Sequence, residues 1–316
     1  MGRMDDDKYE QAQAFMNAGR YGEAIAVYNE LIMLNPQVDS LRLALAWAYR
    51  DSGNVEMAIS IFEALLEKEL SRKLFTGFAF DELVRIFREK EDYRRLIGVC
   101  ERAAAAQPED VSILFTLGES YLSGGRAGDA VRVFQKITEM EPDASSAFCA
   151  LGSALISMGE FDRAEDAFRT AGLIDPSDAG TYFNRLGNAY LNAGEYGRAQ
   201  NAFREAIKCS AGQPLYYCNL GDALLKGGKI AEAEVAYEYA VRINPRFASA
   251  YYNRFGNSLA RENRHLKAID IFKKAIASDS RNPFLYLGLA QSYLAEGMID
   301  LAEEACSTAT TLEAGS

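Results

Sequence analysis

The chain has 316 residues, 49% of them hydrophobic, and a net charge of −11, so it is long enough for two ordinary domains or one extended array. Charged residues and glycines break its apolar runs well before the roughly 18 residues that a membrane helix needs, so we expect no direct membrane insertion. Nucleic-acid binding is disfavoured, because phosphate contacts contribute most when the field of the whole protein attracts them.

The first residues, MGRMDDDKYEQ, are acidic and lack the apolar core of a secretory signal. We therefore expect a cytoplasmic protein, unless a signal peptide was removed. The five cysteines form no C-x-x-C pair, and their odd number argues against a complete disulfide framework. The single His265 argues against most metal and acid–base sites, which combine several His or Cys side chains.

A pattern of apolar and small residues recurs along the chain with a period of 34 residues. In one repeat its members are Leu117, Gly118, Tyr121, Ala130, Phe134 and Pro142, and in the next they are Leu151, Gly152, Leu155, Ala164, Phe168 and Pro176. The template divides the chain into nine repeats, at residues 5–38, 39–72, 77–110, 111–144, 145–178, 180–213, 214–247, 249–282 and 283–316.

This spacing resembles the tetratricopeptide repeat, W-x2-L-G-x2-Y…A-x3-F…P, over almost the whole chain from residue 5. The resemblance implies an all-α fold, a single right-handed superhelical solenoid of antiparallel helix pairs over residues 5–316. Small residues at the eighth and twentieth positions of a repeat let its two helices approach closely. Aromatic residues at the eleventh and twenty-fourth positions fill the gaps on either side.

Turn residues agree with this reading. The pairs Ala193-Gly194, Gly124-Gly125, Met158-Gly159 and Gly227-Gly228 fall between the two helices of their repeats, where a residue with positive φ can end the first helix. Prolines fall where each second helix must stop, as Pro36, Pro108, Pro142, Pro176 and Pro245.

The third repeat, 77–110, is degenerate. Val84 replaces its small eighth residue, Leu96 replaces the alanine at its twentieth position, and four additional residues, Lys73 to Thr76, precede it. We expect disturbed stacking there, with sub-arrays at 5–72 and from 77 or 111 to 316. A hinge and a static irregularity are both compatible with this pattern.

A stripe of polar residues recurs on the first helices of the sixth, seventh and eighth repeats, at positions that do not pack inward. Its members are Asn184, Arg185, Asn188, Asn192, Asn219, Asp222, Lys226, Asn253, Arg254, Asn257 and Arg261, in a segment, 180–282, with net charge +6. Asparagine both donates to and accepts from a peptide backbone, and arginine holds a carboxylate with two parallel hydrogen bonds. The alternative is that these residues merely keep an exposed helical face soluble.

In tetratricopeptide folds the first helices line a concave groove, so the resemblance implies that this stripe meets ligands. It is similar to the asparagine-lined grooves of peptide-binding members and to the clamp that holds chaperone C-termini. Asn188, Asn219 and Arg254 match the clamp, but Asn184 and Ala250 stand where it has lysines. The match to the chaperone clamp is therefore incomplete.

In the N-terminal half the equivalent stripe carries aromatic residues, Tyr9, Trp47 and Phe115, which we interpret as a secondary groove anchor or as packing between neighbouring repeats. Cys149 and Cys218 also face the expected groove. We expect no basic neighbour beside them and interpret them as small apolar liners.

Three functions remain in view. The first is a non-enzymatic scaffold or adaptor that binds an extended acidic or C-terminal peptide of a partner protein. The second is a homo-oligomeric platform, with the outer side of the last helix, Leu301, Ala305, Ala309 and Leu312, partly open. The third, an enzyme or its targeting half, lacks a catalytic motif outside the repeat pattern, so we predict no catalytic residue, metal or cofactor.

Overall fold

The computed structural model describes residues 3–72 and 75–314, with side chains from residue 6 onward. Within these ranges it contains α-helices and one short 3-10 helix but no strand, so the all-α prediction is confirmed. None of the described helices is long and apolar enough to cross a membrane. Lys73, the first residue of the expected insertion, lies outside the described ranges.

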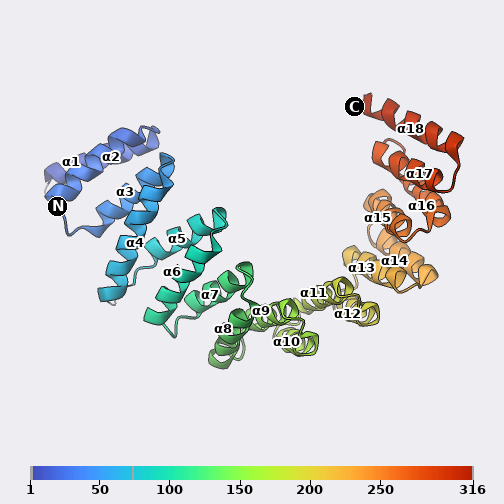
Figure 1. Cartoon of the computed structure of the whole chain (residues 1–316), viewed down its shortest axis with the longest axis horizontal. Helices are drawn as coiled ribbons and strands as arrows, with labels where there is room; N and C mark the ends of the chain where they lie inside the picture. The colour runs from blue at the N-terminus through green and yellow to red at the C-terminus, as the bar shows by residue number, and fades with distance from the viewer. Residues whose placement is uncertain (1–2, 73–74, 315–316) are drawn as a thin grey trace. The chain divides into compact units, whose positions relative to one another are not determined.

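The chain divides into two compact units, Met1–Met140 and Glu141–Ser316. The helices of unit 1 are α1 (Arg3–Asn17), α2 (Tyr21–Leu34), α3 (Asp39–Asp51), α4 (Val55–Arg72), α5 (Phe78–Glu89), α6 (Tyr93–Ala106), α7 (Val111–Ser123) and α8 (Ala127–Met140), drawn from blue to green in Figure 1.

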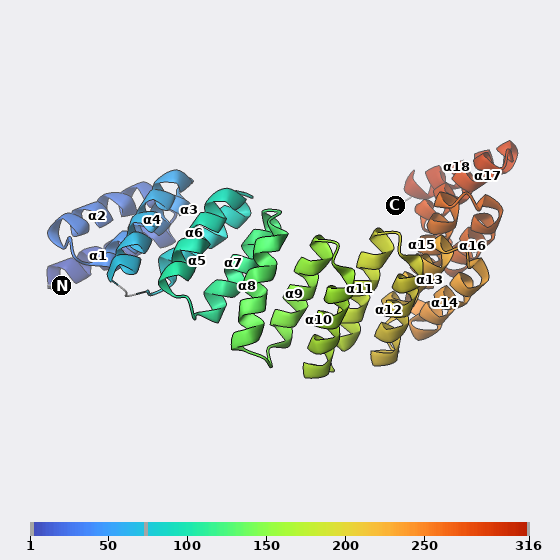
Figure 2. The same cartoon turned by 60° about the horizontal axis from the view of Figure 1, so that its bottom comes forward.

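Unit 2 continues the same alternation of two helices per repeat (Figure 2). Its elements are α9 (Ser145–Ser157), α10 (Phe161–Ile174), α11 (Ala179–Asn192), α12 (Tyr196–Cys209), α13 (Pro214–Lys226), α14 (Ile230–Ile243), η1 (Pro245–Phe247), α15 (Ala248–Arg261), α16 (His265–Ser278), α17 (Pro283–Ala295) and α18 (Ile299–Ala314).

Each predicted repeat holds one pair of contacting helices, from α1 with α2 to α17 with α18. The close approach of each pair depends on the eighth and twenty-fourth residues. A Cβ atom added to Gly187 would lie 2.6 Å from the ring of Phe203, and one added to Gly118 would lie 2.6 Å from the ring of Phe134. The rings of Phe134 and Phe203 are fully buried, so the small–large pairing is the core of the repeat.

The turn between the two helices has the same conformation in every repeat, a positive φ at the fifteenth residue. Seven repeats use glycine there, at Gly19, Gly53, Gly125, Gly159, Gly194, Gly228 and Gly297. The other two use Glu91, at φ 53°, and Asn263, at φ 56°. This left-handed conformation lets the chain reverse after one residue. It is energetically unfavourable for a residue with a Cβ atom but not for glycine.

The degenerate third repeat keeps the helix pair. Val84 and Leu96 are buried despite being larger than their counterparts, and Cys100 occupies the twenty-fourth position, where most repeats have an aromatic ring. A thiol is smaller than an aromatic ring, so a smaller residue at the twenty-fourth position accompanies the larger residues at the eighth and twentieth. Ahead of this repeat Thr76 is held by Glu69, whose Oε1 accepts from Thr76 Oγ1 at 2.6 Å.

The division between the two units falls between α8 and α9, and not at the insertion before residue 77 where we expected irregular stacking. Helices α4 and α5, on either side of the insertion, contact each other. The insertion therefore does not separate the chain into compact parts, and the hinge stays a prediction.

The last helix differs in part from expectation. Leu301 is 44% exposed, as predicted, but Ala305 and Ala309 are only 6% and 1% exposed. These two alanines face the packed side of α18, so the prediction that they lie on its open side is wrong.

Candidate functional site

The first helices of unit 2 form one continuous surface. Helix α11 contacts α9 and α13, and α15 contacts α13 and α17, in addition to the contacts within each repeat. Figure 2 shows α11 and α13 in successive repeats of this unit. Because consecutive first helices contact one another, the polar stripe of α11, α13 and α15 is a single face, which we call the first-helix face.

Hydrogen bonds connect this face across three repeats. Asn219 Nδ2 donates to Asn184 Oδ1 at 2.7 Å, and Arg254 Nη2 donates to Asn219 Oδ1 at 2.7 Å. Asn219 is only 5% exposed. Its amide therefore links helices α11, α13 and α15 to one another and is not available to a ligand, contrary to its predicted role as a contact residue.

Asp222 is the centre of a second set of contacts. Its Oδ2 accepts from Arg254 Nε at 3.0 Å and Nη2 at 2.5 Å. Its Oδ1 accepts from Tyr237 Oη at 2.6 Å and from Ser258 Oγ at 2.8 Å. The carboxylate thus joins the first helix of the seventh repeat to its own second helix and to the first helix of the eighth.

This network changes the protonation properties of its members. Burial lowers the pKa of Arg254, but the adjacent Asp222 carboxylate outweighs it, so the net pKa is raised and the guanidinium stays charged. Burial, and then the same carboxylate, raises the pKa of Tyr237. Arg254 already has a carboxylate partner, so its predicted role in holding a ligand carboxylate is secondary to its structural role. We call the bonded set Asn219, Asp222 and Arg254 the wall.

Three other cations of the face have no carboxylate partner in the part of the chain that the structure describes. Arg185, Lys226 and Arg261 are exposed and form no ion pair there. Lys226 and Arg261 lie in the last turns of α13 and α15, where a cation also interacts favourably with the helix dipole. The face therefore presents one uncompensated positive charge in each of three successive repeats.

The remaining asparagines are accessible to different extents. Asn192 is exposed, whereas Asn188, Asn253 and Asn257 are half-buried. Asn257 Nδ2 donates to Asn253 Oδ1 at 3.1 Å, which leaves the Asn257 carbonyl and the Asn253 amide group for other partners. These four residues keep donors and acceptors beside the three unpaired cations.

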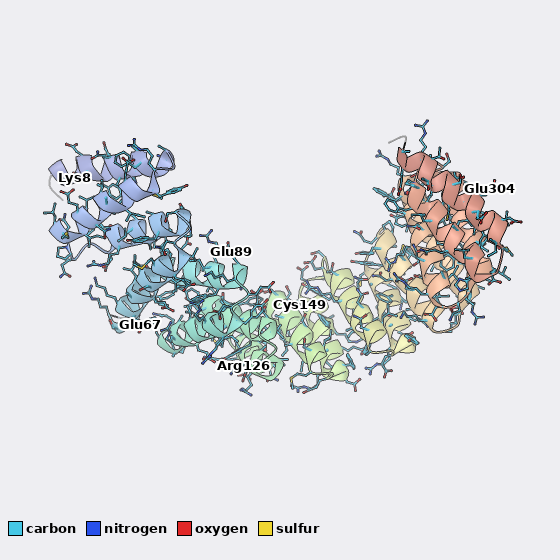
Figure 3. All side chains as sticks on the ribbon, turned by 45° about the horizontal axis from the view of Figure 1, so that its top comes forward. Lys8, Glu67, Glu89, Arg126, Cys149 and Glu304 are labelled. Atoms are coloured by element: carbon cyan, nitrogen blue, oxygen red, sulfur yellow. The ribbon has the colours of Figure 1, made fainter. Side chains whose placement is uncertain are left out.

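Cys149 and Cys218 lie on the same side of the helices, and Figure 3 labels Cys149 on α9. The expectation that they lack a basic neighbour is wrong, since Arg185 Nη1 donates to Cys149 Sγ at 3.3 Å. Burial nevertheless dominates, raises the pKa of Cys149 above its ordinary value and raises that of Cys218 to about 11. Both thiols are therefore protonated at neutral pH.

The three predicted anchors in unit 1, Tyr9, Trp47 and Phe115, are half-buried. Tyr9 packs edge-on against Tyr28 at 6.1 Å, and Phe115 packs edge-on against Phe134 at 5.5 Å, between ring centroids. These contacts lie within their own repeats, so packing accounts for Tyr9 and Phe115. Among the described residues no ring contact involves Trp47, which therefore stays a predicted anchor.

Sequence reasoning missed Tyr237 and Ser258, which complete the shell of Asp222. The repeat pattern indicates a core aromatic role for Tyr237, and Ser258 belongs to a position that holds a small residue in every repeat but the third. Across residues 6–72 and 75–314, no three His, Cys, Asp or Glu side chains are placed to hold a metal ion.

The sequence profile described as "Tetratricopeptide repeat" matches six overlapping segments of the chain. These are residues 9–71, 82–147, 115–180, 149–214, 184–246 and 218–283. Together they cover most of both units, including the whole first-helix face.

Among curated proteins, the chain is similar to "Protein O-mannosyl-transferase TMTC1" of Homo sapiens, with 24% identity over 163 residues. The match covers 50% of this chain but 18% of that protein, so the chain spans less than a fifth of its length. Among solved structures it is similar to "MamA protein", at 25% identity and TM-score 0.44, covering 53% of this chain and 91% of that one. It is also similar to "YrrB: a TPR protein with an unusual peptide-binding site", at 22% identity and TM-score 0.40, covering 57% and 91%.

Proposed function

The chain belongs to the tetratricopeptide repeat family, and we propose that it is a non-enzymatic scaffold or adaptor that binds an extended acidic or C-terminal peptide of a partner protein in the cytoplasm. The first-helix face of α11, α13 and α15 is the proposed site. The helix pairs of the repeat pattern account for the described residues of this chain.

One observation carries this proposal: the first-helix face has a cation in each of three successive repeats, Arg185, Lys226 and Arg261, without a carboxylate partner in the described chain. The protein has a net charge of −11, yet this face carries these three cations, and only its fourth, Arg254, is paired with a carboxylate, that of Asp222. Each charged hydrogen bond to a ligand carboxylate contributes about 1.5–3 kcal/mol. After the cost of ordering the peptide, three such bonds support roughly micromolar affinity.

The half-buried asparagines supply the second part of the site. Asn188 and Asn257 occupy the same position in two repeats and can bond to a peptide main chain, which every extended peptide offers. The wall of Asn219, Asp222 and Arg254 holds the helices in register, so the site is formed before the ligand arrives.

Fluorescence anisotropy with a labelled acidic peptide library tests the proposal. We expect the triple variant Arg185→Ala, Lys226→Ala, Arg261→Ala to bind acidic peptides more than about tenfold more weakly than the wild type, since three charged contacts are lost. The affinity of the wild type should also fall with salt. A comparison of free and amidated C-termini separates an acidic-segment ligand from a C-terminal one.

A matched control removes the same charge elsewhere in unit 2. Arg246, Arg264 and Lys267 are exposed cations outside the first-helix face. The triple variant Arg246→Ala, Arg264→Ala, Lys267→Ala should retain wild-type affinity. Equal losses in the two triple variants would mean that net charge, and not this face, governs binding.

The second candidate function is a homo-oligomeric platform. Apolar side chains near the last helix favour it, since Leu294 is 51% exposed, Ile299 52% and Leu301 44%. Light scattering across a dilution series should then give a mass that rises with concentration and falls in Ile299→Asp. A strict monomer at high concentration would exclude this candidate.

A further inference from the structure

A second cavity lies on the side of unit 2 formed by the second helices. Its floor is Tyr217 and Leu220 of α13, and its walls are Ile207 of α12 with Val235 and Tyr239 of α14. We call this surface the outer groove. Its volume is about 480 Å³, within the range of ligand-binding clefts.

The outer groove is apolar and open to solvent. Val235 is 50% exposed and Tyr239 is 43% exposed. Single exposed apolar residues are common on protein surfaces, but these two line one cavity together with the apolar floor. Tyr239 is fixed in place, because it stacks on Tyr217 at 5.7 Å and lies under the guanidinium of Arg242 at 4.5 Å. The groove is therefore formed without a ligand.

A polar cavity of about 430 Å³ adjoins the outer groove between α10, α11 and α12. Arg204 and Lys208 line both cavities. Arg204 forms an ion pair with Glu232, 3.8 Å from its Nη2 and too long for a hydrogen bond, and its Nη1 donates to Asn201 at 3.3 Å, so most of its donors are unused. Arg169 of the polar cavity, by contrast, is bonded to Glu165 at 2.8 Å.

We propose that the outer groove binds an amphipathic helix of a partner protein, with large apolar side chains along one face and an Asp or Glu on its flank that pairs with Arg204. Two helices, α12 and α14, form the walls and a third forms the floor, so the side-chain ridges of another helix fit between them. The unused donors of Arg204 select an acidic flank over a basic one, since Arg204 and Lys208 outnumber Glu232, the one acid of the lining. This site is separate from the first-helix face, because the two share helix α13 but no residue of it.

The test uses a synthetic probe, a fluorescein-labelled helical peptide with Leu at i, i+3, i+4 and i+7 and Glu on the flanks, titrated with the full chain. A sequence-scrambled peptide of the same composition and a peptide with Lys in place of Glu serve as ligand controls. Val235→Asp and Arg204→Glu alter the groove, whereas Leu266→Asp and Arg264→Glu make the same chemical changes at exposed positions on or just before α16. Circular dichroism confirms that each variant is folded.

We expect the probe to bind the wild type, and Val235→Asp and Arg204→Glu each to weaken binding by about tenfold or more. Leu266→Asp, Arg264→Glu and the Arg185, Lys226, Arg261 triple variant should bind the probe as the wild type does, which makes failure of this site distinguishable from failure of the first-helix face. Hydrogen exchange should show probe-dependent protection in α12 and α14. The proposal is overturned if the wild type does not bind the probe, if the scrambled peptide binds equally well, or if both groove variants retain wild-type affinity.

Discussion

Arg254 and Asp222 form an ion pair that joins two successive repeats, with Arg254 Nη2 2.5 Å and Nε 3.0 Å from Asp222 Oδ2. The side chain of Asp222 is 16% exposed and that of Arg254 is 37% exposed, so water screens the pair only partly. The pair occupies the middle of a face whose other cations have no such partner. Asp222 and Arg254 are therefore structural residues of this face, whereas Arg185, Lys226 and Arg261 remain available to a ligand.

Replacing Asp222 should destabilise unit 2. Asp222→Asn removes the countercharge of a partly buried guanidinium and weakens the bonds from Tyr237 and Ser258. We expect a loss of about 1.5–3 kcal/mol in the free energy of unfolding, measured by urea denaturation. Asp162→Asn, at a side chain that is 88% exposed, should change it by less than about 0.5 kcal/mol. Similar values for the two variants would contradict the role of Asp222 in the wall.

Two glycine-to-alanine changes should have opposite effects within one repeat. Gly187→Ala places a methyl group 2.6 Å from the buried ring of Phe203, so we expect a destabilisation of about 1–3 kcal/mol. Gly197→Ala, on α12, meets no atom within 4 Å and should stabilise the helix by up to about 1 kcal/mol. Thermal and urea denaturation of both variants give the comparison. If Gly187→Ala were as stable as the wild type, close helix approach would not explain the small eighth residue.

The strained turn of the third repeat should respond to glycine. Glu91 adopts a φ of 53°, a conformation that destabilises the folded state by about 1–2 kcal/mol for a residue with a side chain. Glycine removes this strain, but its greater conformational freedom stabilises the unfolded chain and offsets part of the gain. We expect Glu91→Gly to raise the free energy of unfolding by about 0.5–1 kcal/mol. The reverse change at an equivalent position, Gly125→Ala, with φ at 74°, should lower it. A loss of stability in Glu91→Gly would show that the side chain contributes more than its conformation costs.

Stability should decline at alkaline pH through two buried thiols. Burial raises the pKa of Cys100 and of Cys218 from 9.0 to about 11. Between these values each thiol is protonated in the folded protein and ionised in the unfolded chain, so unfolding releases a proton and stability falls as pH rises. Each thiol contributes at most about 1.4 kcal/mol per pH unit in this window.

Urea unfolding at a series of pH values from about 8 to 10.5 measures this slope. The double variant Cys100→Ala, Cys218→Ala should show a smaller slope than the wild type, whatever its absolute stability. Cys306→Ala, at an exposed cysteine, should leave the slope unchanged. An unaltered slope in the double variant would mean that other groups cause the alkaline loss.

Much of the fold was predictable because its determinants recur at fixed spacing. Gly187 and Phe203, or Gly118 and Phe134, are visible as a pair in the sequence, and a large buried ring at the twenty-fourth position favours a small residue at the eighth. The turn glycines were equally visible, since a positive φ is rare for other residues. The third repeat was harder to interpret, because its substitutions at Val84, Leu96 and Cys100 compensate one another only when seen together.

By itself the sequence determined the helix pairs, the residues that pack between them and the stripe of each first helix that avoids the core, because these follow from a helical period and a repeat length. Only the tertiary structure decided which members of that stripe bond to one another. The contacts of Asn219, Asp222 and Arg254 join side chains 32 to 35 residues apart, and they depend on the distance and rotation between neighbouring helices. The outer groove also requires three helices at once, and for that reason no single stretch of sequence indicated it.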